Sequence, residues 1–181
     1  MIIDLDTEAS RDPDRAGSKA AWLARGQGAG LPVLPGFVVE AAESRFHMSL
    51  GAATLAKRGS GGARLAIMEQ TLPLADELVD AGARVGPAVV ARSSTALESS
   101  GEWSGAFTSY VGLVPPELPR AVVGCWASAF SVAALGRLEA AGLEPGSFPM
   151  AVVVQRALAP AAGGTARIDD DGAVTVNAVK G

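Results

Sequence analysis

Three short segments carry residues whose types and spacing could bind a phosphorylated ligand. In the first, Gly17 and Ser18 form a turn that brings Lys19 to the start of a predicted helix. A helix N-terminus presents unpaired backbone N–H groups and a partial positive charge, and a lysine adds a full one. Phosphate suits this arrangement. Because the segment lacks the P-loop pattern, a surface lysine after a turn remains the alternative interpretation.

The second segment is an apolar strand that ends in an arginine. Residues 89–92 read VVAR, and Ser93 and Ser94 follow. A guanidinium offers a rigid fork of donors that matches phosphate oxygens, so Arg92 is a second candidate for the same ligand. A surface ion pair between Arg92 and Glu98 explains the arginine equally well.

The third segment, MAVVVQ at residues 150–155, is the most strand-like run in the chain. Gln155 at its end could offer its amide, together with nearby backbone groups, to a planar base. It could also be the polar end of a core strand. The run of aspartates at 169–171 precedes Gly172 in a predicted hairpin tip, so we interpret these residues as a solvated turn and not as a metal site.

The composition excludes several classes of site. The chain has 181 residues, a net charge of −4 and 49% hydrophobic residues, which indicates a folded protein without a bulk electrostatic attraction to nucleic acid. His47 and Cys125 are its only histidine and cysteine, so no internal disulfide and no cysteine metal cluster can form. We predict a structural helical position for His47 and a core position for Cys125. Neither a signal peptide nor a long apolar run is present, so we expect a cytoplasmic protein without a membrane span.

The hydrophobic pattern predicts helices between short strands, which is typical of an α+β or mixed α/β fold. Ser18 is the expected cap of the first helix, in which Trp22 faces inward, and residues 57–64 are expected to be a flexible connection. A second helical stretch is divided at Pro73, with Thr71 as the cap. We predict strands at 2–5, 31–39, 86–92, 106–113 and 149–158, a hairpin at 166–176, and helices at 18–25, 40–48, 64–82 and 115–142.

Four blocks, in order, resemble the N-terminal nucleotide-binding domain of phosphoenolpyruvate synthase, pyruvate phosphate dikinase and rifampicin phosphotransferase. That family opens with a glycine-glycine-lysine turn and a GLPVPPGFVV strand. Here the blocks are AGSKAAWLARGQGAGLPVLPGFVV at 16–39, VVARSSTALESSGEWSGAFTSYVGL at 89–113, GCWASAF at 124–130 and MAVVVQ at 150–155. The resemblance covers residues 12 to about 164 and implies an incomplete ATP-grasp domain. We expect mixed sheets with flanking helices, a first lobe at 1–113 and the start of a second at 114–181.

The resemblance also implies roles for individual residues. Lys19 and Arg92 would contact the phosphates of ATP and act in catalysis, and Thr108 or Ser109 would lie close by. Gln155 would lie at the hinge beside the adenine. In the family, a phosphoryl group of ATP passes to a histidine on a separate swivelling domain, and cations stabilise the transition state.

The sequence departs from the family in ways that bear on function. Ala106 stands where the family has a glutamine, and Ser99 where it has an aspartate. NAVKG at 177–181 matches the middle of the family domain, so the acidic residues that hold Mg²⁺ and the phosphohistidine lie in parts that the chain does not match. We therefore expect ATP as a cofactor, with Mg²⁺ ligands supplied from elsewhere and none in this chain.

The leading hypothesis is an ATP-binding subunit of a split phosphotransferase, active only with a second subunit. That partner would supply the rest of the nucleotide lobe and the phosphohistidine. Such a division predicts an exposed apolar strand edge near 149–181, which a partner or a second copy of the chain covers. The alternative is a non-catalytic scaffold or regulatory protein that retains half of an ATP-grasp fold, and the alanine at 106 favours it. A self-contained small-molecule kinase is a third hypothesis, for which the chain offers no metal ligands.

Overall fold

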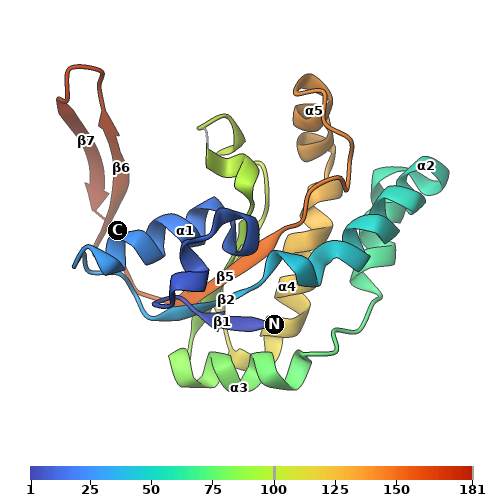
Figure 1. Cartoon of the computed structure of the whole chain (residues 1–181), viewed down its shortest axis with the longest axis horizontal. Coiled ribbons are helices and arrows are strands. Elements are labelled where there is room, and N and C mark those ends of the chain that lie inside the picture. The colour runs from blue at the N-terminus through green and yellow to red at the C-terminus, as the bar shows by residue number, and fades with distance from the viewer. Residues whose placement is uncertain (100, 181) are drawn as a thin grey trace.

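The computed structural model describes residues 1–99 and 101–180. Its centre is a five-stranded sheet in which every neighbouring pair of strands is antiparallel (Figure 1). This arrangement confirms the predicted α+β class. Across the sheet the strands are β1 (Ile2–Asp4), β2 (Gly36–Val39), β5 (Ala151–Arg156), β3 (Val89–Ser94) and β4 (Ser109–Leu113).

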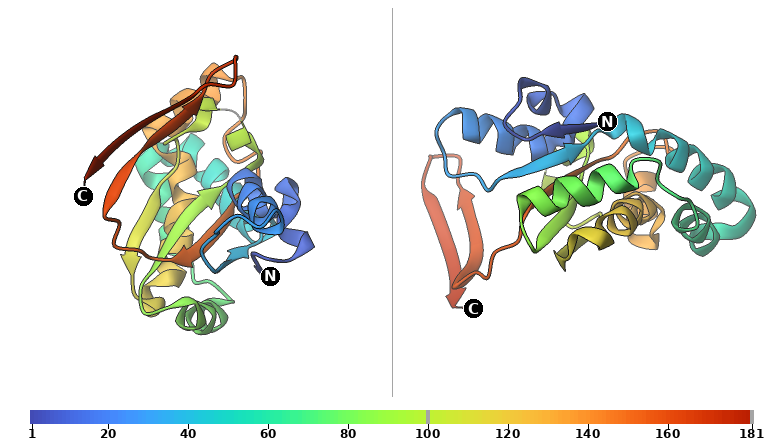
Figure 2. Two further views of the ribbon diagram at one scale, coloured as in Figure 1. Left: turned by 90° about the vertical axis from the view of Figure 1, so that its left-hand side faces the viewer. Right: turned by 90° about the horizontal axis from the view of Figure 1, so that it is seen from below.

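Helices cover both faces of the sheet, with α1 on one face and α3 and α4 on the other (Figure 2). The side chains of β5 alternate between two cores, as the period of a strand requires. Val153 packs with the alanines of α1, and Val152 and Val154 pack with Trp126 and its neighbours. The helices are α1 (Pro13–Gly28), α2 (Arg45–Met68), α3 (Ala75–Val85), α4 (Leu118–Ala127) and α5 (Val132–Ala140).

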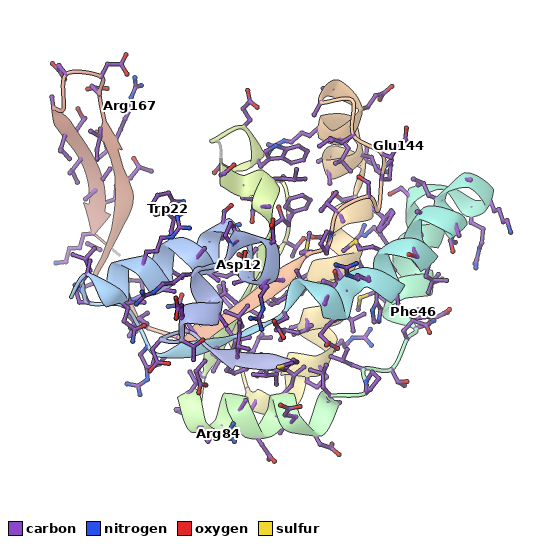
Figure 3. All side chains as sticks on the ribbon, viewed as in Figure 1. Asp12, Trp22, Phe46, Arg84, Glu144 and Arg167 are labelled. Atoms are coloured by element: carbon purple, nitrogen blue, oxygen red, sulfur yellow. The ribbon has the colours of Figure 1, made fainter. Side chains whose placement is uncertain are left out.

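Helix α1 begins earlier than predicted and is kinked. Asp12 caps it by accepting a hydrogen bond from the Asp14 N–H at 2.9 Å, so the prediction of Ser18 as the cap is wrong. The prediction that Trp22 faces inward is also wrong, because its side chain is 64% exposed and points away from the sheet (Figure 3). The helix turns a stripe of small residues to the sheet, and Trp22 lies on the opposite side. That stripe is Ala16, Ala20 and Ala24.

Strand β5 confirms the strand predicted at 149–158, but it is central and not at an edge. Its two neighbours are β2 and β3, so both of its backbone edges are paired. The prediction of an unpaired apolar edge on this strand is therefore wrong. The sheet contains four strands from residues 1–113 and one strand, β5, from the residues after 113. The division of the chain into two lobes at residue 113 stays a prediction.

Residues 57–64 do not form the predicted flexible connection, because they lie within α2. The helix is interrupted only at Gly59, whose φ is 66°, and Ser60 Oγ there donates to the Phe130 carbonyl at 2.6 Å. Leu74, not Thr71, occupies the N-cap position of α3. The helix predicted at 115–142 is divided, since Ser131 caps the new helix α5 by accepting from the Ala134 N–H.

The predicted hairpin is present and projects away from the body (Figures 1 and 2). It consists of β6 (Ala162–Ile168) and β7 (Val174–Lys180), which pair in register and are exposed along their whole length. In the half of the hairpin near its turn, the register gives one apolar face and one polar face. The apolar face pairs Ile168 with Val174 and Ala166 with Val176, and the polar face pairs Arg167 with Thr175 and Thr165 with Asn177.

In the described part of the chain, no single helix is long and apolar enough to cross a membrane. The bent pair of segments Pro115–Phe130 and Val132–Ala140 reaches that length and composition only together. Most of the first segment is core, since the residues of α4 are buried apart from Pro119 and Arg120.

Candidate functional site

Helix α1 lies against the end of β3 just after its kink at Gly17, and backbone hydrogen bonds fix this contact. The Ser18 N–H donates to the Thr95 carbonyl at 3.0 Å, and the Ala20 N–H donates to Ser94 Oγ at 3.2 Å. Ser18 Oγ also donates to the Ala96 carbonyl. These bonds satisfy N–H groups that follow the kink, and they hold Lys19 beside the end of the strand.

A cavity of about 340 Å³ lies at this contact. It brings together three of the residues predicted for the site, namely Lys19, Arg92 and Ser109. Arg92 and Ser109 are register partners on β3 and β4, so their side chains leave the same face of the sheet. The prediction that Lys19 and Arg92 converge on one cleft is confirmed. The rest of the lining is Glu98, Ser99, Ser104, Gly105 and Phe107.

Lys19 is held by two acceptors. Its Nζ donates to the Ser93 carbonyl at 3.0 Å and forms an ion pair with Glu98 Oε1. The second oxygen of that carboxylate accepts from the Thr95 N–H at 3.0 Å. The sequence interpretation that paired Glu98 with Arg92 is therefore wrong.

Arg92 is half-buried, and among residues 1–99 and 101–180 it has neither an ion pair nor a side-chain hydrogen bond. Arg92 lines the cavity, and its N–H donors make no bond to the described residues.

Thr108 and Ser109 were alternatives for one role, and the geometry separates them. Thr108 is absent from the cavity lining, and its backbone is engaged toward α4. The Thr108 N–H donates to Ser128 Oγ at 3.0 Å, and the Thr108 carbonyl lies 3.6 Å from the thiol of Cys125. Ser109 is the residue that the sheet places next to Arg92.

Gln155 is nearly buried and does not line the cavity. Its Nε2 donates to the Leu34 carbonyl at 3.0 Å, beside Gly36, its register partner on β2. The amide therefore fixes the segment that enters β2. Its predicted place beside an adenine stays a prediction.

Two buried hydroxyls next to the cavity, Ser93 Oγ and Thr95 Oγ1, have no hydrogen-bond partner among the residues that the structure describes. The same two residues bind the ion pair through their backbones, since the Ser93 carbonyl accepts from Lys19 and the Thr95 N–H donates to Glu98. The role of Glu98 in holding the lysine was not predicted from the sequence. The signal was the spacing of Thr95 and Glu98, because a glutamate three residues after a threonine commonly accepts from the threonine N–H.

No group of three or more His, Cys, Asp or Glu side chains in the described residues is arranged to hold a metal ion. The aspartates at 169–171 form the exposed hairpin turn, as predicted. Cys125 is buried in the core, also as predicted, and burial raises the pKa of its thiol to about 12. His47 is buried against Trp126, with 4.5 Å between ring centroids, and burial lowers the pKa of its imidazole.

A family model described as pyruvate phosphate dikinase, AMP/ATP-binding domain, matches residues 60–181, which is more than half of the chain. The matched range contains Arg92, Glu98, Ser109 and Gln155 and begins after Lys19. No curated protein sequence shows significant similarity to the chain.

Proposed function

The chain belongs to the pyruvate phosphate dikinase AMP/ATP-binding domain family, and we propose that it binds ATP with the phosphates in the cavity between α1 and β3. The observation that carries this proposal is the joint lining of that cavity by Lys19 and Arg92. These residues lie 73 positions apart in the sequence, and α1 and β3 bring them together beside the hydroxyl of Ser109.

The chemistry of the lining suits a phosphate chain. The guanidinium of Arg92 can bind two phosphate oxygens at once, which gives direction as well as charge. The ammonium of Lys19 has three donors, two of which are engaged with Ser93 and Glu98, so one is left for the ligand. Ser109 can donate a further hydrogen bond from β4.

The described residues of this cavity do not fit a divalent cation, since Glu98 is the only carboxylate among them. Mg²⁺ neutralises much of the charge of ATP and usually needs one or two carboxylates together with the phosphates. We therefore assign no metal-dependent step to this chain. In our proposal Mg²⁺ reaches the nucleotide with ligands from outside the described residues.

Phosphoryl transfer is the finer part of the proposal. The acceptor would be a histidine on a second polypeptide, which also completes the nucleotide lobe. Support comes from the hairpin of β6 and β7, whose apolar face is exposed although such faces are normally covered. In this proposal Lys19 and Arg92 stabilise the charge that develops on the transferred group.

A scaffold or regulatory role is the second candidate, and two observations favour it. Lys19 is already neutralised by Glu98, and the amide of Gln155 is engaged with Leu34. Both side chains therefore also contribute to the fold without a ligand.

Isothermal titration calorimetry with ATP separates the two candidates. The wild-type chain is expected to bind ATP, and Arg92→Ala to bind it about tenfold more weakly or worse, because a charge-assisted hydrogen bond contributes about 1.5–3 kcal/mol. Arg64→Ala is the matched control, since it removes an exposed arginine of α2 that does not line the cavity. Absence of binding by the wild type, alone and with a candidate partner, would support the scaffold role.

A further inference from the structure

Glu98 is a carboxylate inside a cavity whose other charges are positive. Only 6% of its side chain is exposed, while 28% of the Lys19 side chain is exposed. The turn in which it lies fixes its position, since the Glu98 N–H donates to the Thr95 carbonyl at 3.2 Å and the Thr95 N–H donates back to Glu98 Oε2. The carboxylate is thus anchored by the backbone N–H of Thr95, independently of Lys19.

Because the carboxylate is anchored, its negative charge stays in the cavity when an anion enters. Lys19 and Arg92 contribute two positive charges and Glu98 one negative charge, so the lining has a net charge of +1. A phosphate that approaches Lys19 must weaken its ion pair with Glu98, and it is repelled by a carboxylate that cannot move far.

We propose that, within the phosphate-binding role assigned above, Glu98 competes with the ligand for Lys19 and thereby selects polyphosphates over single phosphates. A monophosphate gains too little from Arg92 and a shared lysine to offset the repulsion. A triphosphate can contact both cations at once, so it gains enough to draw the Lys19 ammonium away from the anchored carboxylate. Glu98 is then a specificity-determining residue, which keeps the cavity closed to abundant small anions.

The opposite role is a positioning one, in which Glu98 orients Lys19 toward the ligand. The two roles predict opposite signs when the charge of Glu98 is removed. Competition predicts tighter anion binding, and positioning predicts weaker binding. The sign of the change therefore decides between them.

The test is calorimetry with inorganic phosphate, inorganic tripolyphosphate and ATP at low ionic strength, on the wild-type chain and Glu98→Gln. Glutamine keeps the shape and can still accept from the Thr95 N–H, but it has no charge. Competition predicts that Glu98→Gln binds tripolyphosphate about tenfold more tightly and phosphate by a larger factor, so that the ratio of the two affinities decreases. Glu102→Gln is the control, because it removes an exposed carboxylate four residues away that does not line this cavity.

Tripolyphosphate affinity that is unchanged within about twofold, or weaker, in Glu98→Gln overturns the competition. Should that variant not fold, Glu98→Asp retains the charge but is too short to reach Lys19. It is expected to bind tripolyphosphate between twofold and tenfold more tightly than the wild type, and equal or weaker binding again overturns the inference. If tripolyphosphate behaves as expected but ATP binds no better than it, the competition stands and the nucleotide function fails. If ATP binds the wild type and Glu98→Gln equally, the nucleotide function stands and the competition fails. If no probe binds to any variant, both the competition and the nucleotide function are overturned.

Discussion

Gly17 lies so close to Ser94 that no side chain fits between them. A Cβ on Gly17 would come within 2.2 Å of the Ser94 carbonyl carbon and oxygen, and the φ of Gly17 is +73°. Two features therefore require a glycine at this position: the left-handed backbone conformation and the close approach of α1 to β3. Because Lys19 follows two residues later and Arg92 precedes Ser94 by two, this one contact sets the distance between the cations of the cavity.

Substitution Gly17→Ala should therefore destabilise the protein by about 2 to 5 kcal/mol, as the sum of left-handed strain and overpacking. Gly30→Ala is the matched control, because Gly30 also has a positive φ of +81°, but a Cβ added there would meet no atom within 4 Å. The control should lose only about 1 to 2 kcal/mol. Urea unfolding of both variants measures the difference, and equal losses would show that the approach to Ser94 imposes no constraint.

Cys125 should be unreactive while the protein is folded. Burial raises the pKa of its thiol from 9.0 to about 12, so at pH 8 only about one thiol in 10⁴ is ionised, and the thiolate is the reactive form. Iodoacetamide should modify the folded chain very slowly and the chain in guanidinium within minutes, as mass spectrometry can measure. Rapid modification under native conditions would contradict the buried position.

The same pKa gives a dependence of stability on pH. A thiol that holds its proton more tightly when folded contributes stability that is complete below the unfolded pKa of 9.0 and is lost as pH rises toward about 12. Cys125→Ala lacks this group, so its free energy of unfolding, measured by urea denaturation across that range, should fall less steeply than that of the wild type.

At acid pH the stability of the protein should depend on His47, and here stability is lost as pH falls and not as it rises. Burial lowers the pKa of its imidazole below the ordinary 6.5, and this effect outweighs the smaller, opposite effect of the Glu43 backbone. The folded protein therefore favours the neutral ring, and stability is lost as pH falls from 6.5 through the lower folded value. His47→Met keeps an apolar side chain against Trp126 and removes the titration. The stability of wild type relative to this variant should decrease between pH 7.5 and pH 5, and a constant difference would contradict the prediction.

The strands were predictable because their sequences are locally distinctive. The runs MAVVVQ at 150–155 and VVAR at 89–92 suit a sheet whatever surrounds them, although β3 continues past Arg92 to Ser94. Helix α2 was not predictable in the same way, since RGSGG at 58–62 is typical of a linker. Tertiary contacts outweigh that composition, because Ser60 bonds to Phe130 and Ile67 is buried in the core.

Local sequence also predicts only part of the site. A lysine at a helix start and an arginine at a strand end each indicate phosphate, and the order of the four blocks indicates that they meet. Local spacing could not show which cation Glu98 pairs with, because Lys19 lies 79 residues away and Arg92 only six. The answer depends on how closely α1 approaches β3, and this is set by Gly17.

The last prediction concerns the apolar face of the hairpin. Ile168 and Val176 are 73% and 64% exposed, so replacing both with glutamate should leave the melting temperature of the body nearly unchanged, since exposed positions outside the core contribute little. If a partner that completes the nucleotide lobe covers this face, two buried carboxylates should abolish its binding. Thr165→Glu with Thr175→Glu is the control, because it adds the same charge to the opposite face. Size-exclusion chromatography with light scattering on the chain, alone and co-expressed with its gene neighbours, measures the association. A complex that both double variants retain, or a wild-type chain that stays monomeric with every neighbour, would count against the partner and favour the scaffold role.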